Sequence, residues 1–445
     1  MSFSAASLRA ALELSVPERA SGLVVALSGG ADSASLLQAA AALRLGFRSL
    51  PLRAVHIDHG LQASASRFRQ ACEGLCRQLD VPLHVISVRV HCEPGASLEA
   101  AARDARYAAL AAELKAQECL LTAHHRLDQA ETFLLQALRG AGVKGLSAMP
   151  PCREFGLGWH VRPVLDVPRE ELLKFGADLG VADLTDPMNE DLRFDRSFLR
   201  KTIWPMIAGR WPGADTALSR TARHVAQAQE QLDLSAAADV ARLRDGEALS
   251  VTGLRALTSA KRVNAVRYWL NEAGAEAPST ARLNEALRQV LEAAEDHQPA
   301  IVWGGAALRR YRQRLFLTAA DPPRLATSKQ WGTREDSIVL GDGLGSLTWR
   351  PQIGGLAPDA LPPVLLVRRR VGGETLKPAR SADTHTVQHL CQSLGVLPWM
   401  RDALPLVFAG DALIAVADLW MDARWCAATD APGLSIAWNN APQVI

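Results

Sequence analysis

Six residues near the N-terminus, Ser28-Gly29-Gly30-Ala31-Asp32-Ser33, combine small, hydroxyl and acidic side chains in a spacing suited to binding an anion. They follow the apolar run 23–27, which is typical of a buried strand, and precede a stretch with helical character that begins at residue 34. Adjacent glycines let the backbone approach a ligand closely, and the unpaired N–H groups of a helix start attract negative charge. A carboxylate beside a phosphate is best explained by a divalent cation between them. The segment therefore predicts a nucleotide site with Mg²⁺, and an ordinary serine-glycine turn is the alternative.

Two other kinds of phosphate loop can be tested against this chain. A Walker loop needs a Gly-Lys pair, and no such dipeptide occurs in the 445 residues. The segment 140–145 matches G-x-G-x-x-G, but it follows a helical stretch rather than a strand, so we reject dinucleotide binding. The pattern SGGxDS after a strand resembles instead the PP-loop of N-type ATP pyrophosphatases. That resemblance implies an enzyme that splits ATP between its α and β phosphates.

A second polar cluster, over residues 124–132, follows the apolar run 119–123. Asp128 and Glu131 are three residues apart at the start of an expected helix, so both carboxylates can project from one face and hold Mg²⁺ or an ammonium group. Acids that complement the positive end of the helix dipole are the alternative. His124 and His125 lie beside these acids, but a transition-metal site needs more ligands at defined spacing, so we expect no zinc.

A third cluster contains two arginines on an expected helix over residues 98–114. Arg103 and Arg106 are three residues apart, so they lie on one helix face and can bind a phosphate or a carboxylate together. A solvated helix surface is the alternative.

The elements that must position these clusters are strands and helices in alternation. Apolar runs at 23–27, 52–57, 83–89, 119–123 and 160–164 predict strands, and helical patterns such as 65–79 and 98–114 lie between them. This order predicts a parallel sheet covered by helices, whose ligands lie beyond the carboxyl ends of the strands. The loops after the first, second and fourth strands would then meet at one cleft.

Length predicts several domains, because 445 residues is about three times a typical domain of ~150 residues. We expect an α/β catalytic domain with a PP-loop and a parallel sheet over 1–212, and a mainly helical, substrate-binding domain over 213–320. Short β-rich runs are expected at 308–317 and 337–350. The Pro- and Gly-rich stretch 351–363 favours a linker, and we place the linker region at 321–363, before a small α+β C-terminal domain over 364–437.

Composition limits the cellular setting and the partners. The chain has 49 basic and 47 acidic residues, so nucleic acid would have to bind a local patch rather than bulk charge. Seven cysteines without a C-x-x-C motif favour reduced thiols. The chain has neither an uncharged apolar run of about 18 residues nor a basic region followed by an apolar core near its start. We therefore expect a cytoplasmic protein that does not enter a membrane.

Taken together, the motifs resemble those of the tRNA(Ile)-lysidine synthetases. The resemblance rests on SGGADS, HIDHGL at 56–61, the run 99–107, TAHHRLDQAET at 122–132 and the run 138–146, with further similarity at 186–200, 368–374 and 395–402. It extends over nearly the whole chain and is weakest over 214–300. Leu127, Met188, Ser197 and the pair Gln388-His389 depart from the residues usual in the family.

The resemblance implies a two-step reaction on the wobble cytidine of tRNA(Ile) with a CAU anticodon. ATP adenylates the cytosine C2 oxygen, and the amine of free L-lysine then displaces AMP to give lysidine. Catalytic roles would be carried by Asp32, Arg106, Asp128 and Glu131. Besides the loop 28–33, His59 and His125 would bind ATP, and Asp32 and Asp128 would hold Mg²⁺ or the lysine amine.

The same resemblance implies a basic surface that binds tRNA, including its acceptor stem. Its expected members are Arg139, Lys144, Arg196, Arg200, Arg368, Arg370, Lys377, Arg380 and Arg401. We expect no obligate protein partner. Another PP-loop enzyme that modifies RNA or forms amides, and a non-catalytic tRNA-binding protein, are the alternatives.

Overall fold

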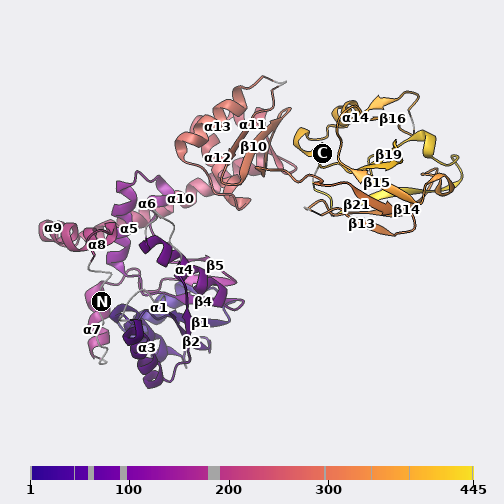
Figure 1. The fold of residues 1–445 in the computed structure, drawn as a ribbon. Coiled ribbons are helices and arrows are strands. Elements are labelled where there is room, and N and C mark those ends of the chain that lie inside the picture. Colours follow the sequence, from indigo (N-terminus) through magenta and orange to yellow (C-terminus); the bar gives the residue numbers. More distant parts are fainter. Residues whose placement is uncertain are drawn as a thin grey trace. The chain divides into compact units, whose positions relative to one another are not determined.

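The computed structural model describes residues 3–44, 46–58, 65–90, 98–178, 191–294, 297–341, 343–379, 381–442 and 444 (Figure 1). They divide into two compact units, Met1–Leu232 and Asp233–Ile445. The expected ligand His59 and the expected RNA contact Arg380 lie outside the described residues.

The first unit is built on a six-stranded sheet with the order β3-β2-β1-β4-β6-β5. All neighbours are parallel except β5 and β6, which form an antiparallel pair. The five expected strands are confirmed with small shifts at their ends, and β5 is an additional one. The strands are β1 (Gly22–Ala26), β2 (Leu52–Asp58), β3 (Leu83–Ser87), β4 (Glu118–Leu121), β5 (Cys152–Phe155) and β6 (Gly158–Val161).

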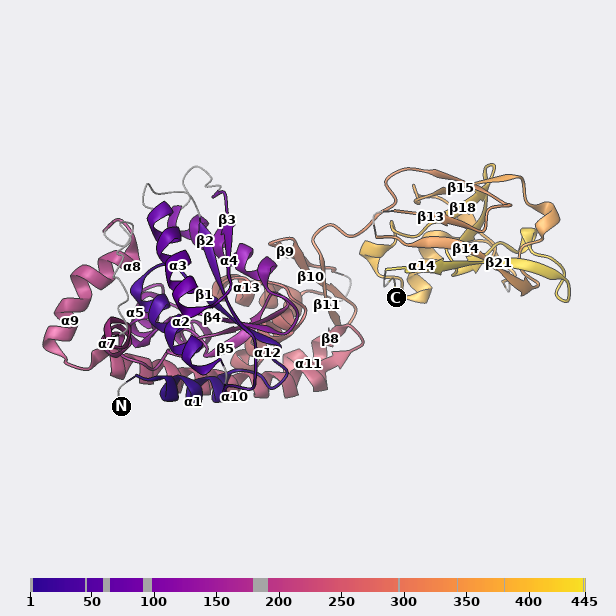
Figure 2. The same cartoon turned by 90° about the horizontal axis from the view of Figure 1, so that it is seen from below.

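Helices pack on both faces of this sheet, and the apolar strands are buried from both sides (Figure 2). Successive residues of β1 show this: Val25 joins a core with α1, α2 and α3, whereas Val24 joins a core with Leu110 of α4. No strand precedes the short helix α6, consistent with rejecting dinucleotide binding at 140–145. The helices are α1 (Ala5–Ser15), α2 (Ala31–Leu43), α3 (Ala65–Leu79), α4 (Leu98–Glu113), α5 (Arg126–Leu138), α6 (Val143–Leu146), α7 (Arg169–Asp178), α8 (Asp195–Phe198), the π-helix η2 (Leu199–Ile203) and α9 (Trp204–Arg210).

The helical region that follows also contains a small sheet. The long helix α10 (Ala214–Leu243) leads into a five-stranded sheet with the order β7-β8-β11-β10-β9. Three helices, α11 (Val251–Ala256), α12 (Ser259–Glu272) and α13 (Thr280–Glu292), share an apolar core with it. The strands are β7 (Arg244–Asp245), β8 (Ala248–Ser250), β9 (Ala300–Trp303), β10 (Ala306–Tyr311) and β11 (Arg314–Ala319).

The C-terminal part contains two main antiparallel sheets, β12-β15-β18-β19-β20 and β13-β14-β21, with the pair β16-β17 and the helix α14 (Val387–Leu394). Its strands are β12 (Lys329–Gly332), β13 (Ser337–Val339), β14 (Ser346–Ile353), β15 (Val364–Arg368), β16 (Thr375–Leu376), β17 (His385–Thr386), β18 (Leu406–Ala409), β19 (Ala412–Val416), β20 (Trp420–Met421) and β21 (Pro432–Asn439).

The β-rich run expected at 337–350 is confirmed by β13 and β14, and the linker region expected over 321–363 is wrong for residues 329–353. There β12 pairs with β15, and β14 pairs with β21 over eight residues. Pro351 lies where β14 extends beyond β13, so one strand edge has no neighbour and tolerates a residue without an N–H group. Gly355 allows a close approach of two backbones, since a Cβ atom there would lie 2.5 Å from the Leu434 carbonyl oxygen. Proline and glycine here mark sheet geometry rather than flexibility.

Candidate active site

The predicted anion loop lies between the end of β1 and the start of α2. The Oγ atoms of Ser28 and Ser33 are 3.0 Å apart, and the Ser33 hydroxyl donates to the Gly30 carbonyl at 3.0 Å. Gly29 has φ +90°, and a Cβ atom there would lie 2.8 Å from Phe68 Cδ1, so glycine is required for both conformation and space. Gly30 is the N-cap of α2 without a capping side chain, which leaves the first helical N–H groups available to an anion.

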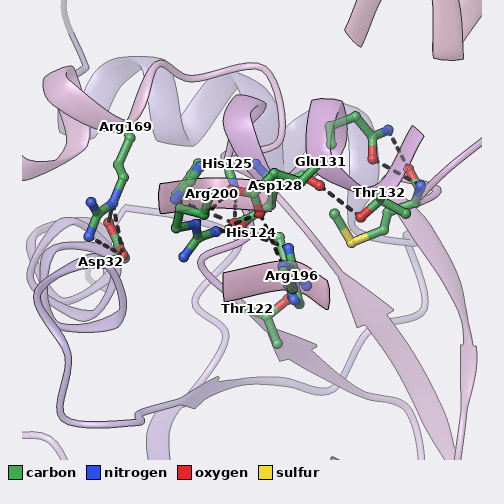
Figure 3. Close-up of polar contacts among 12 residues, drawn as sticks. Asp32, Thr122, His124, His125, Asp128, Glu131, Thr132, Arg169, Arg196 and Arg200 are labelled. Atoms are coloured by element: carbon green, nitrogen blue, oxygen red, sulfur yellow. Dashed lines mark hydrogen bonds and ion pairs between the residues drawn. The ribbon is translucent and has the colours of Figure 1, made fainter. Parts of the chain in front are cut away.

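Asp32, in the first turn of α2, forms an ion pair that the sequence analysis missed. Arg169 Nε lies 3.2 Å from Asp32 Oδ1, and Nη2 of the same guanidinium donates to Oδ2 at 3.3 Å (Figure 3). Arg169 is the first residue of α7, 137 residues away, and no local pattern could have revealed it. Both side chains are partly exposed, at 29% and 37%, so the carboxylate remains accessible to a cation.

The second predicted cluster begins at the N-terminus of α5. His125 is the N-cap: its Nδ1 accepts from the Asp128 N–H at 3.4 Å, and Asp128 Oδ2 accepts from the His125 N–H at 3.0 Å. Burial lowers the pKa of His125, so the ring is neutral near pH 7, and the charge of Asp32 acts on it in the opposite direction. The loop after β1 and the loop after β4 therefore meet, as the sequence predicts.

Asp128 and Glu131 share one face of α5 and bind two arginines; these four residues form the acid–arginine cluster (Figure 3). Arg196 Nη2 and Arg200 Nη2 both donate to Asp128 Oδ1, at 2.9 and 2.8 Å. Arg196 Nε and Arg200 Nε donate to the two oxygens of Glu131, at 3.1 and 2.6 Å. Glu131 is fully buried. In this structure the two arginines, which we expected to bind tRNA, pair with Asp128 and Glu131.

The electrostatics of the cluster follow from these contacts. Burial alone would raise the pKa of Asp128, but nearby positive charge outweighs it, and the pKa falls well below its usual range. Because His125 is neutral, Arg196 and Arg200 are the effective charges. Burial likewise acts to lower the pKa of Arg200, yet its bonds to Glu131 and Asp128 raise it. The cluster therefore pairs two carboxyl groups with two guanidinium groups, with a formal sum of zero.

A chain of hydrogen-bonded polar side chains connects the carboxyl ends of β4 and β6; we name Arg162, His160, Thr122 and His124 the histidine relay. Arg162 Nη2 lies 3.1 Å from His160 Nδ1, and Thr122 Oγ1 lies 2.8 Å from His160 Nε2 and 2.7 Å from His124 Nδ1. Burial lowers the pKa of His160 to about 2 and that of His124 to about 3. His160 and Arg162 were not predicted from the sequence; a polar residue within the apolar strand β6 and another directly after it were the available signal.

The remaining predicted residues of the first unit lie around this site. Arg103 and Arg106 both lie over the ring of Tyr107, with Cζ 5.2 and 5.6 Å from its centroid, so they do share a helix face. Arg139 ends α5 and pairs with Asp195 at 3.3 Å. Lys144 lies on α6.

The predicted RNA-binding arginines of the C-terminal part have partners within it. Arg368 lies 2.9 Å from Glu374 and 4.1 Å from the Phe408 ring centroid, and Arg370 lies 2.9 Å from Asp402. Arg401 Nε donates to a backbone carbonyl, and Lys377 has its backbone N–H bonded to Asp422. Arg369, between the two paired arginines, is exposed.

The described residues contain no group of three or more His, Cys, Asp or Glu side chains arranged to hold a metal ion. None of their helices combines the length and apolar character needed to cross a membrane.

Family models match three parts of the chain, and curated relatives match most of its length. Residues 4–207 match the family model of a PP-loop domain, 249–316 that of a TilS substrate binding domain, and 365–438 that of a TilS substrate C-terminal domain. The tRNA(Ile)-lysidine synthase of Alkalilimnicola ehrlichii is 40% identical over 420 residues, covering 94% of each chain. That of Coxiella burnetii is 37% identical over 420 residues, covering 94% of this chain and 92% of its own. The solved structure of U34-tRNA thiolase NcsA from Methanococcus maripaludis is similar with a TM-score of 0.41 and 14% identity, over 49% of this chain and 78% of that chain.

The parallel sheet, the SGGADS loop at the end of β1 and the matched PP-loop model define the class: this is an enzyme with a PP-loop ATP-binding domain. The two further domain matches and the full-length relatives narrow that class. The chain belongs to the tRNA(Ile)-lysidine synthase family.

Proposed function

We propose that the protein ligates free L-lysine to C2 of the wobble cytidine of tRNA(Ile) with a CAU anticodon. In the first step the cytosine O2 bonds to the α phosphorus of ATP, and pyrophosphate leaves with the electron pair of the broken P–O bond. In the second step the lysine ε-amine bonds to C2 and loses a proton, and AMP leaves with the electron pair of the broken C2–O bond. Membership of the family and the order of motifs along the chain support this proposal.

The loop 28–33 would bind ATP in the first step. Hydroxyls of Ser28 and Ser33 and the free N–H groups at the start of α2 would bind the pyrophosphate part of ATP. Asp32 fits Mg²⁺, because its carboxylate is a hard oxygen ligand, partly exposed and held by a single arginine. When bound, Mg²⁺ would neutralise charge on the phosphates. Asp128 fits less well, since both of its oxygens already accept hydrogen bonds.

The acid–arginine cluster is our candidate for the lysine site. Free lysine carries two ammonium groups and one carboxylate, and the cluster holds two carboxylates and two guanidinium groups with a balanced charge. Arg196 and Arg200, at 25% and 31% exposure, could bind the lysine carboxylate, while Asp128 binds an ammonium group. Glu131, which is fully buried, would hold the arginines in place. Arg106 would offset charge that develops during the reaction.

The observation that carries the proposal is the anion loop beside a charge-balanced cluster in a chain related over 94% of its length to lysidine synthases. The test incubates the protein with ATP, Mg²⁺, labelled lysine and a transcript of tRNA(Ile) with a CAU anticodon. We expect label on the RNA and release of AMP and pyrophosphate, both dependent on ATP. RNA binding without release of pyrophosphate would instead support a non-catalytic tRNA-binding protein.

A further inference from the structure

The histidine relay has one internally consistent set of hydrogen-bond directions. A guanidinium only donates, so Arg162 donates to His160 Nδ1, and the hydrogen of the neutral His160 ring must lie on Nε2. That Nε2–H donates to Thr122 Oγ1. The hydroxyl hydrogen of Thr122 then has one remaining acceptor, His124 Nδ1 at 2.7 Å. Thr122 and His160 are buried, so any other arrangement would leave a polar hydrogen without a partner.

These directions determine the state of His124. Its Nδ1 accepts a hydrogen bond, so the neutral ring carries its hydrogen on Nε2. The low pKa that burial imposes on His124 keeps the ring neutral near pH 7. Nε2 lies on the side of the ring away from Thr122. Nothing in the described part of the chain accepts its hydrogen, and Nε2 is not among the fully buried unpaired polar atoms there, so a ligand atom can reach it.

The position of His124 indicates which ligand group it meets. It follows β4, which is the neighbour of β1, and the anion loop extends from β1. Arg103 and Arg196 are among the charges that act on its ring, while the charge of Asp128 is balanced within the acid–arginine cluster. A neutral N–H donor in these surroundings fits an anionic oxygen.

We propose that His124 is a catalytic residue whose Nε2–H donates a hydrogen bond to an oxygen of the ATP α phosphate, and that Thr122, His160 and Arg162 are positioning residues that fix its tautomer. The phosphate contact rests on the proposed function, because it requires ATP as the adenylating substrate. A donor held in one direction stabilises charge on that oxygen as the α phosphorus is attacked. The relay also excludes His124 as the general base toward lysine, since neither ring nitrogen is free to take a proton.

Two pairs of variants test the role in the full-length protein. Thr122→Val keeps the shape of the side chain but removes the hydroxyl, and Thr122→Ser restores it. His124→Ala removes the donor, and His124→Gln replaces it with an amide N–H. We expect pyrophosphate release at saturating ATP and tRNA to fall about tenfold in Thr122→Val and about 100-fold in His124→Ala, with KM for ATP within about twofold and with most activity restored by Ser and Gln.

Thr132→Val is the matched control, because it removes a partly buried hydroxyl whose partner is the Asp128 backbone carbonyl on the same helix. It should turn over like the unmodified protein. Wild-type turnover in Thr122→Val, or an equal loss in Thr132→Val, would overturn the role of the relay.

The tautomer has an independent readout in the ¹⁵N spectrum of histidine-labelled protein, where His124→Gln assigns the signals of His124. We expect an unprotonated Nδ1 and a protonated Nε2 at pH 7. A protonated Nδ1 would overturn the proposal. If the unmodified protein releases no pyrophosphate from ATP, the proposed function and the phosphate contact both fail, while the tautomer still depends on this spectrum alone.

Discussion

Asp32 is held by Arg169 in the helix turn whose N–H groups face the same ligand. Asp32→Asn removes the negative charge but keeps the size of the side chain, so we expect pyrophosphate release to fall at least about 100-fold through loss of Mg²⁺ and of the ion pair. The affinity for tRNA should be unchanged, because the loop acts on phosphates of ATP. Asp80→Asn is the control, since Asp80 is 94% exposed and pairs only loosely with Arg44. Equal activity of the two variants would contradict the loop assignment.

The acid–arginine cluster should also contribute to stability, because Glu131 is a fully buried carboxylate. Arg200→Met leaves it with a single guanidinium partner, and we expect the free energy of unfolding to drop by roughly 3 kcal/mol. Adding Glu131→Gln removes the uncompensated charge and should recover part of that loss, so the two effects will not be additive. Urea unfolding of the two single variants and the double variant measures the coupling. Strict additivity would mean that the two groups do not interact.

At this scale the sequence predicted the local placement of side chains better than their partners. The i, i+3 spacing correctly placed Asp128 and Glu131 on one helix face. Their arginines lie 65 to 72 residues away, and such pairs leave no periodic signal in the sequence. For the same reason Arg196 and Arg200 were expected to face RNA.

The strands β4 and β6 bring two neutral histidines together, and this gives stability a dependence on pH. The folded pKa is about 2 for His160 and about 3 for His124, whereas an unfolded histidine titrates near 6.5. Below that value the unfolded chain binds protons that the folded chain does not. The two histidines therefore leave the free energy of unfolding at its full value above about pH 6.5 and lower it as the pH falls. We expect a loss of up to about 1.4 kcal/mol per pH unit for each histidine between pH 6.5 and 5, measured by urea unfolding.

A variant separates the histidines from other titrating groups. His160→Gln should have a shallower slope over this range, by about one proton. An unchanged slope would show that His160 is protonated in the folded protein.

Element boundaries were predictable where one pattern dominated. The amphipathic pattern over residues 65–79 coincides with α3, and the apolar runs located β1 and β2 within one residue. The strand β5 was missed because Arg153 and Glu154 interrupt its apolar pattern. The run 337–350 was correctly predicted to be β-rich. The linker region around it was drawn too wide, because the proline and glycine at 351–363 permit both flexible chain and strand edges, and only the pairing with β15 and β21 distinguishes the two.

The pairing of β12 with β15 and of β14 with β21 predicts how truncated fragments unfold. A fragment that starts at residue 364 lacks β12 and β14, and with them the buried Trp331, which stacks on Trp349 at 4.3 Å. It would expose the whole edge of β21 that β14 covers, so we expect no cooperative unfolding transition. A fragment over 323–445 retains both strands and should unfold cooperatively, as followed by circular dichroism in urea. Equal behaviour of the two fragments would restore the interpretation of 329–353 as a linker.

Over the whole molecule the formal net charge is only +2, so contact with tRNA has to come from individual exposed cations. Arg368 and Arg370 are paired with Glu374 and Asp402, whereas Arg369 between them is exposed. We therefore expect Arg369→Ala to weaken tRNA binding and to reduce the slope of log Kd against log salt by about 0.7 to 0.9, the value for one phosphate contact.

The comparison with Arg368→Ala separates RNA contact from folding. That variant removes the bond to Glu374 and the contact with Phe408, so it should lower the stability of the C-terminal part while changing the salt slope little. Arg334→Ala removes an exposed arginine from the turn between β12 and β13 and controls for loss of charge. Filter binding across a salt series decides among them. One result would contradict this prediction: Arg369→Ala and Arg334→Ala keep the salt slope of the unmodified protein, whereas Arg368→Ala lowers it by one phosphate contact. Arg368 would then bind RNA by releasing Glu374, and exposure of a side chain would not identify the arginines that contact RNA.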